Sequence, residues 1–218
     1  MKRYLELVPS ILTKNSDEVY EKIDFLSAIP EVTTAQIDFA DGKFVPNELV
    51  NPRALKKFDT RLKLEAHLMT QAPAHYFESL AHLGFSAVFI HYESFRSKEE
   101  VGAALQNARH AGLRSGLAVN PSTGVEVFDW LEGMYDEALV MGVNPGLQGQ
   151  AFIPETMERV QVLRGKHPDV IIEVDGGVKL ENVSSLVAHG ANKLNVGSGI
   201  WQTPNPEKTI RELIAKLK

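Results

Sequence analysis

The stretch "LKLEAHL", residues 62–68, alternates apolar and polar side chains along its whole length. In an extended chain the apolar side chains share one face and the polar side chains share the other: Leu62, Leu64 and Ala66 against Lys63, Glu65 and His67. A strand of a closed barrel has this pattern, because one face contacts the surrounding helices and the other faces the barrel interior. The stretch therefore predicts a barrel strand whose interior side chains are polar.

Seven other short apolar or β-branched runs recur along the chain, with helical segments between them. The eight predicted strands are 5–11, 33–38, 62–68, 87–92, 115–120, 137–143, 170–175 and 192–197. Eight strand-then-helix units in 218 residues predict an α/β fold, a (β/α)8 TIM barrel forming a single domain over residues 1–218. The alternative is an open doubly wound sheet, but no GxGxxG follows the first strand.

Three helices carry clear local signals. An apolar stripe of Val19, Ile23 and Leu26 follows Ser16. Ser97 and Glu100 form a capping box ahead of another stripe. The segment 205–218 has Asn205 as its N-cap and Pro206 in its first turn. These signals place helices after the first and fourth strands and at the end of the chain.

The composition excludes several functional classes. The net charge of −5 gives no sign of a nucleic-acid partner, and the absence of cysteine excludes disulfides and thiolate chemistry. Glu6 and Pro9 interrupt the first ten residues, which therefore do not read as a signal peptide. Because no run reaches the ~20 apolar residues of a membrane helix, we expect no membrane partner and a cytoplasmic protein.

The same alternation predicts buried charges inside the barrel. Glu173 has the parity of Asp175 in its strand, just as Glu65 has that of His67. A buried carboxylate needs a partner. By parity, the nearest candidates are Lys63 and Lys193.

Polar residues also mark the strand ends, where barrel enzymes place their sites. Following the interior parity to each end gives Ser10, Gln36 with Asp38, His67, His91, Asn120, Met141, Asp175 and Gly197. Two aspartates and a histidine from three strands suit a divalent metal. A single Asp at such a position is more often a helix cap or turn residue, so the convergence of the set on one rim carries the hypothesis.

Glycine-rich turns follow three late strands: "NPGLQGQ" (144–150), "DGGV" (175–178) and "VGSG" (196–199). Backbone N–H groups in such turns can bind a phosphate, which barrels commonly hold after strands seven and eight. Glycine also simply permits tight turns. Both interpretations can hold here.

Together these motifs resemble the ribulose-phosphate 3-epimerase family. The resemblance rests on "VPSIL" (8–12), "DFADGKFVPN" (38–47), "HLM" (67–69), "VNPST" (119–123), "LVMGVNPGLQGQ" (139–150), "EVDGGV" (173–178) and "VGSGI" (196–200). It implies a TIM barrel of the ribulose-phosphate-binding type. It also implies a 3-epimerase of the pentose phosphate pathway, an isomerase that interconverts D-ribulose 5-phosphate and D-xylulose 5-phosphate.

The resemblance further implies roles for individual residues. Asp38 and Asp175 would be the catalytic acid and base, and one divalent ion (manganese, magnesium, zinc, iron or cobalt) would bind to Asp38, His67 and Asp175. The implied sugar-phosphate contacts are Ser10, His67, Met141, Gly146, Leu147, Gln148, Gly149, Gly176, Gly177, Gly197 and Ser198. Relatives are oligomers, so we expect a homo-oligomer, with Trp130 and Trp201 either in its interface or in the core.

Three positions depart from the family pattern. The family's His-x-Asp-x-Met-Asp-Gly reads Gln36-Ile37-Asp38-Phe39-Ala40-Asp41-Gly42 here, so Gln36 replaces the fourth metal ligand and Ala40 a pocket methionine. We expect Gln36 to reach the ion weakly or through water, with a preference for harder metals. Gln148 replaces a phosphate-loop glycine and would either adopt a glycine-like backbone or offer its side-chain amide to the anion.

These departures leave two further hypotheses open. The chain could be a non-catalytic sugar-phosphate-binding paralogue that has lost its metal. It could instead epimerise a ketohexose 6-phosphate such as allulose 6-phosphate, admitted by the room that Ala40 leaves. Retention of Asp38, His67 and Asp175 favours an active epimerase.

Overall fold

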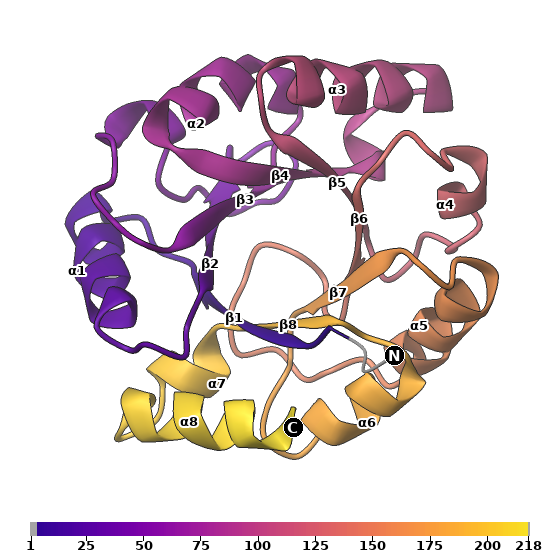
Figure 1. Cartoon of the computed structure of the whole chain (residues 1–218). Coiled ribbons are helices and arrows are strands. Elements are labelled where there is room, and N and C mark those ends of the chain that lie inside the picture. Colours follow the sequence, from indigo (N-terminus) through magenta and orange to yellow (C-terminus); the bar gives the residue numbers. More distant parts are fainter. Residues whose placement is uncertain (1–3, 218) are drawn as a thin grey trace.

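The computed structural model describes residues 4–217, and its eight parallel strands close into a barrel in chain order (Figure 1). The strands are β1 Glu6–Ile11, β2 Thr34–Ala40, β3 Lys63–Met69, β4 Phe85–His91, β5 Arg114–Val119, β6 Glu137–Met141, β7 Ile171–Asp175 and β8 Lys193–Val196. The predicted (β/α)8 barrel is confirmed.

Helices surround the barrel. They are α1 Ser16–Ser27, α2 Phe77–Leu83, α3 Lys98–His110, α4 Val127–Trp130, α5 Glu155–Lys166, α6 Val183–His189, α7 Ser198–Trp201 and α8 Pro206–Lys216. The Ser97 hydroxyl accepts from Glu100 N at 3.3 Å, and the Asn205 side chain accepts from Lys208 N at 3.0 Å, as the capping signals predicted. The predicted last helix ends at Lys216, and Lys218 lies outside the described residues.

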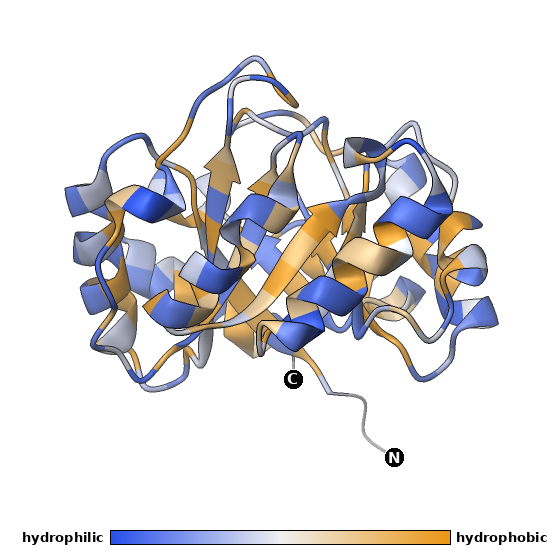
Figure 2. Cartoon of the chain, turned by 90° about the horizontal axis from the view of Figure 1, so that it is seen from above, coloured by the Kyte–Doolittle hydropathy of each residue, from blue (hydrophilic) through white to orange (hydrophobic). Residues whose placement is uncertain are grey.

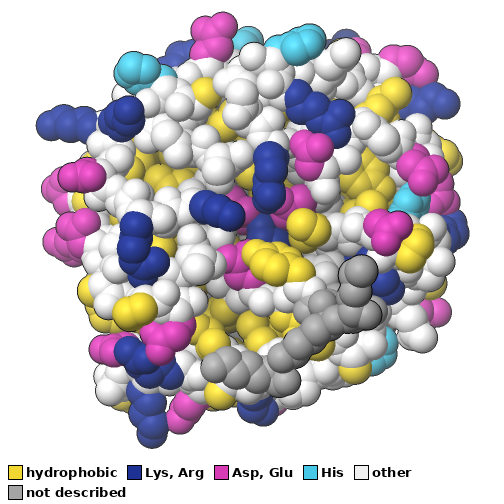
Figure 3. All heavy atoms as spheres, viewed as in Figure 1, with side chains coloured by type: hydrophobic (Ala, Val, Ile, Leu, Met, Phe, Trp, Pro, Cys, Tyr) yellow, Lys and Arg dark blue, Asp and Glu magenta, His cyan; other side chains and the backbone are white. Residues whose placement is uncertain are grey.

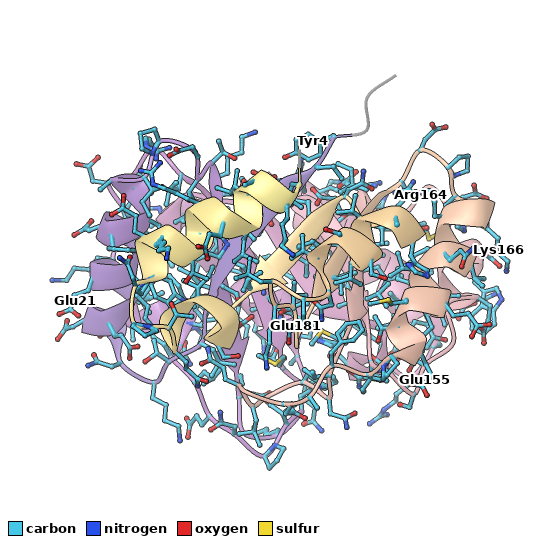
Figure 4. All side chains as sticks on the ribbon, turned by 90° about the horizontal axis from the view of Figure 1, so that it is seen from below. Tyr4, Glu21, Glu155, Arg164, Lys166 and Glu181 are labelled. Carbon is cyan, nitrogen blue, oxygen red and sulfur yellow. The ribbon has the colours of Figure 1, made fainter. Side chains whose placement is uncertain are left out.

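The strands present the two faces that their alternation predicts. On β3, Leu64 and Ala66 belong to the core between strands and helices, whereas Glu65 and His67 are buried inside the barrel. The strand arrows point toward the long loops and away from both termini (Figure 2). The helices return the other way: α5 starts at Glu155 on the loop side and ends at Lys166 near the opposite side (Figure 4). The carboxyl ends of all strands therefore form one rim.

A cluster of charges fills the opposite end of the barrel interior. Lys193 Nζ lies 2.5 Å from Glu65, 2.9 Å from Glu137 and 3.2 Å from Glu173. The half-exposed Arg114 caps the cluster by pairing with Glu65 and Glu137. Figure 3 shows side chains of both charges gathered over the centre of this face. Burial raises the pKa of Glu173 to about 8. With Glu173 protonated, the carboxylates of Glu65 and Glu137 face the buried Lys193 and the half-exposed Arg114.

Lys193 is thus the predicted partner of Glu65 and Glu173, but the prediction for Lys63 was wrong. Lys63 is exposed at the first position of β3. It has the parity of Glu65 but lies two residues earlier, about 7 Å closer to the open end of the barrel. The second cation near Glu65 is instead Arg114, the first residue of β5.

Two remaining expectations concern surfaces. No helix within residues 4–217 is long and apolar enough to cross a membrane. The Trp201 indole N–H donates to the Ser10 carbonyl at 2.7 Å, so this side chain packs against the end of β1. Trp130 is 52% exposed.

Candidate active site

A pocket opens at the carboxyl-terminal rim of the barrel. Its lining includes Asp38 and Asp175, with Asn195 beside them. It also includes every residue predicted to contact the sugar phosphate: Ser10, His67, Met141, Gly146, Leu147, Gln148, Gly149, Gly176, Gly177, Gly197 and Ser198. Residues from β1, β2, β3, β6, β7 and the loops after β6, β7 and β8 therefore meet at one place, as the strand-end argument predicts.

Two carboxylates and an imidazole form the floor of this pocket. His67 Nδ1 lies 2.9 Å from Asp38 Oδ1 and 3.2 Å from Asp175 Oδ2. Asp38 and His67 are register partners on β2 and β3, and Asp175 reaches them across the barrel from the end of β7. All three side chains are buried. The three side chains that the sequence argument placed at one rim therefore lie next to one another.

Burial and mutual charge shift the protonation of this group. Burial raises the pKa of Asp38 to about 6, and the nearby charge of Asp175 adds to this effect. Burial opposes a charge on His67, but hydrogen bonds to Asp175 and Asp38 raise its pKa to about 10. Without another cation, an imidazolium therefore bridges the two carboxylates.

Gln36 lies directly beneath this floor and has no exposed surface. Its Nε2 donates to Asp38 Oδ1 at 2.9 Å and to Asp175 Oδ2 at 2.8 Å. These are the two oxygen atoms that His67 also contacts. Gln36 is thus adjacent to the predicted ligands, but the atom that it turns toward them is a nitrogen donor rather than the oxygen a metal would bind.

Behind His67 runs a chain of hydrogen bonds. His67 Nε2 lies 2.8 Å from His91 Nε2, and His91 Nδ1 lies 3.3 Å from Glu93 Oε2. Burial lowers the pKa of His91, so its neutral ring accepts from His67 and donates to Glu93. Glu93 is fixed in turn by the Asn120 backbone N–H at 2.8 Å. The chain holds the His67 ring with Nδ1 toward the carboxylates.

The donor set fits a divalent metal ion. One ligand atom from each of Asp38, His67 and Asp175 can be chosen so that all lie within 4.8 Å of one another. Two carboxylates buried side by side repel each other unless a positive charge lies between them. Carboxylate oxygen and imidazole nitrogen are ligands that zinc and harder divalent ions both accept.

The glycine loops form the pocket wall nearest to Ser10. Gly177 has φ of +68°, and a Cβ at this position would lie 2.7 Å from Phe152 Cα. Only glycine satisfies both constraints. Gln148 has no such backbone, because no described non-glycine residue has positive φ. Its buried Nε2 has no hydrogen-bond partner within residues 4–217 and lies near Gly197. The structure therefore favours the second of the two alternatives for Gln148, an amide directed into the pocket.

Besides Gln36 and His91, three other residues from the sequence argument lie outside the pocket lining. Asp41 accepts from the backbone N–H groups of Lys43, Phe44 and Gln71, which makes it a turn residue. Ala40 is buried against Val45, Leu49 and Met69, so the extra room expected from it does not appear in the pocket. Asn120 contributes its backbone to the Glu93 contact.

Sequence reasoning missed two residues near the floor. Asn195 donates through Nδ2 to Gln36 Oε1 at 2.6 Å. Alternation puts it on the same face of β8 as Lys193, but the sequence argument followed that face to Gly197 and did not select Asn195. Glu93 follows β4 and carries no such signal, because it lies on a short 3-10 turn over Tyr92–Ser94.

Comparisons with known sequences all point to one protein family. Residues 6–201 match the Ribulose-phosphate 3 epimerase family. Ribulose-phosphate 3-epimerase of Escherichia coli strain K12 is 32% identical over 225 aligned positions, covering 100% of this chain and 97% of the relative. The Schizosaccharomyces pombe enzyme is 35% identical, covering 81% and 78%. A rice protein named ribulose-phosphate 3-epimerase, cytoplasmic isoform, is 33% identical, covering 95% and 92%.

Solved structures support the fold. The tryptophan synthase A-subunit of Pyrococcus furiosus superposes with a TM-score of 0.72 at 15% identity, covering 99% of this chain and 100% of the other. A 3-hexulose-6-phosphate synthase superposes with a TM-score of 0.70 at 13% identity, covering 98% and 100%. At these identities the likeness concerns the barrel alone.

Proposed function

The chain belongs to the ribulose-phosphate 3-epimerase family, and we propose that it is a sugar-phosphate 3-epimerase, an isomerase that interconverts D-ribulose 5-phosphate and D-xylulose 5-phosphate. The convergence of Asp38 and Asp175 on one pocket floor carries this proposal. We place the reaction in the pentose phosphate pathway. We also place it in the cytoplasm, as the name of the rice relative supports.

Epimerisation at C3 needs a base on one face of the carbon and an acid on the other. Asp38 and Asp175 come from β2 and β7, which lie across the barrel from each other. One carboxylate takes the C3 proton, and the other returns a proton to the opposite face.

We propose that Asp38, His67 and Asp175 hold one divalent ion, with manganese the best match to an oxygen-rich set. When bound, this ion would supply positive charge that stabilises the negative charge developing on the substrate oxygens. The His91–Glu93 chain keeps His67 Nδ1 directed toward Asp38 and Asp175, the residues that would hold the ion with it.

The phosphate end of the substrate would lie against the glycine loops. The proposed contacts are backbone N–H groups around 147–149, 177 and 197–198, with the Ser10 hydroxyl nearby. The unpartnered Gln148 Nε2 adds a side-chain donor. A buried amide N–H without a partner is costly, which favours a ligand oxygen at this position.

The two alternative functions have less support. A ketohexose 6-phosphate substrate was inferred from room at Ala40, but Ala40 packs against Val45 and Leu49 and does not line the pocket. A non-catalytic paralogue would have no need to bring two carboxylates and His67 together in a buried site, where each unpaired charge is costly. We also retain the expectation of a homo-oligomer, which light scattering would test.

The decisive experiment follows the C3 proton. Purified protein with D-ribulose 5-phosphate and manganese in deuterated water should exchange that proton, as seen by NMR. Asp175→Asn should reduce net epimerisation by roughly 1000-fold or more, because one face of C3 then has no group that can carry the proton. Asp41→Asn is the matched control, since Asp41 lies at the end of the same strand as Asp38 but only caps a turn. No exchange by the wild type with any divalent metal would refute the proposed function.

A further inference from the structure

The amide of Gln36 has a defined direction. Its Nε2 faces Asp38 Oδ1 and Asp175 Oδ2, and its Oε1 accepts from Asn195 Nδ2 at 2.6 Å. The reverse orientation would place an amide oxygen against two carboxylate oxygens and a nitrogen against the Asn195 nitrogen. The carboxylates and Asn195 therefore select the same orientation of Gln36.

The side chain of Asn195 has an acceptor oxygen that makes no hydrogen bond to any described residue. This side chain is 1% exposed, and its Oδ1 has no hydrogen-bond partner among the described residues. A buried carbonyl oxygen without a partner is unfavourable, so a purely structural amide would be expected to satisfy it. The unpaired oxygen and the donating nitrogen belong to one amide, and a half-turn of that amide exchanges them.

A cation between Asp38 and Asp175 would reverse the preference of Gln36. A positive ion repels the amide N–H groups and attracts the amide oxygen, which is a hard ligand. Turning Gln36 over directs its N–H groups at Asn195, and Asn195 has to turn as well to accept from them through Oδ1. The pair then keeps one internal hydrogen bond in either state.

We propose that Gln36 and Asn195 are a coupled amide pair that reverses when a divalent ion binds, with Asn195 as the residue that positions the Gln36 oxygen. This inference rests on the proposed function for the metal at Asp38, His67 and Asp175. It gives Gln36 a role as a conditional ligand. In the absence of the ion its N–H groups stabilise the carboxylates by hydrogen bonds, and with the ion present its oxygen completes the site.

A double-mutant cycle on manganese affinity tests the coupling without turnover. Asn195→Asp offers only acceptor oxygens, so it should favour the reversed Gln36 and tighten manganese binding. Its added negative charge also tightens binding by itself, and Gln36→Leu measures that part. The gain from Asn195→Asp should be roughly 5- to 10-fold larger with Gln36 present than in the Gln36→Leu background, the effect of about one buried hydrogen bond. An equal gain in both backgrounds would overturn the proposal.

A second measurement is made on the wild type and uses other variants only to assign its signals. The ion used is magnesium, which is diamagnetic and therefore suits NMR. When it is added to the wild type, the side-chain NH₂ signals of Gln36 and Asn195 should both shift. Signals are assigned by their loss in Gln36→Glu and Asn195→Ser. Failure of either signal to move at saturating magnesium, or no manganese binding to the wild type, would overturn the amide-pair proposal. The C3-exchange assay reports separately on the proposed function, so the two failures can be distinguished.

Discussion

Replacing Lys193 by methionine tests how the charge cluster at the base of the barrel is balanced. Lys193 is 2% exposed and lies within 3.2 Å of three glutamates. Methionine fills a similar volume, so the change removes the charge with little loss of packing. Two carboxylates then remain against Arg114 alone, because Glu173, with a pKa raised to about 8 by burial, is already protonated.

The magnitude follows from the proton that one carboxylate must take up. A glutamate with an ordinary pKa of about 4.3 costs about 3.7 kcal/mol to protonate at pH 7 and about 1 kcal/mol at pH 5. This range agrees with the roughly 3–5 kcal/mol lost when a buried ion pair loses one partner. In the variant, a carboxyl in the folded state has its pKa raised above the unfolded value. The difference in unfolding free energy from the wild type should therefore grow as pH rises.

Urea unfolding followed by circular dichroism at pH 5 and pH 7 measures this difference. We expect Lys193→Met to lower the free energy of unfolding by about 4 kcal/mol at pH 7. At pH 5 this loss should be smaller by roughly 2.7 kcal/mol. Adding Glu65→Gln should restore most of the loss at pH 7, because it removes the uncompensated charge; Glu65→Gln alone is the control. A loss of equal size at both pH values would refute the charge argument and point to packing instead.

Three further predictions concern single groups. Glu93→Gln should weaken manganese binding by roughly 10-fold, because it loosens the chain through His91 to His67; isothermal titration calorimetry measures this, and unchanged affinity would contradict the chain. Gln148→Gly should weaken the binding of inorganic phosphate by roughly 3- to 10-fold, and equal or tighter binding would show that the amide is no contact. Asp41→Ala should lower the unfolding free energy by about 2 kcal/mol and leave C3 exchange intact; lost exchange would place Asp41 in the chemistry.

Alternation along the strands predicted most of the fold and much of the site. A period of two assigns each side chain to a face, and that was enough to bring Asp38, His67 and Asp175 to one rim. It does not assign the position of a side chain along the barrel axis. Lys63 shares a face with Glu65 but lies one repeat nearer the open end, while Lys193 reaches Glu65 from β8.

Contacts across the barrel could not be predicted from the sequence. The orientation of Gln36 depends on Asn195, which is 159 positions away, and on Asp175, which is 139 positions away. The resemblance identified Gln36 as a departure at a ligand position. Only the closed barrel shows which of its two polar atoms faces the carboxylates, because that choice depends on polar and charged groups brought together by four different strands.

The burial of the pocket floor sets an order of events. Asp38 and His67 are 4% and 1% exposed, and both line the same rim pocket as the glycine loops. An ion travelling through this pocket to the floor passes the place where the sugar phosphate would lie. The ion would then load first, and a bound sugar phosphate would lie over its way out. Release of the ion to a chelator should accordingly slow when a sugar phosphate fills the pocket, because the bound substrate would block the path by which the ion leaves.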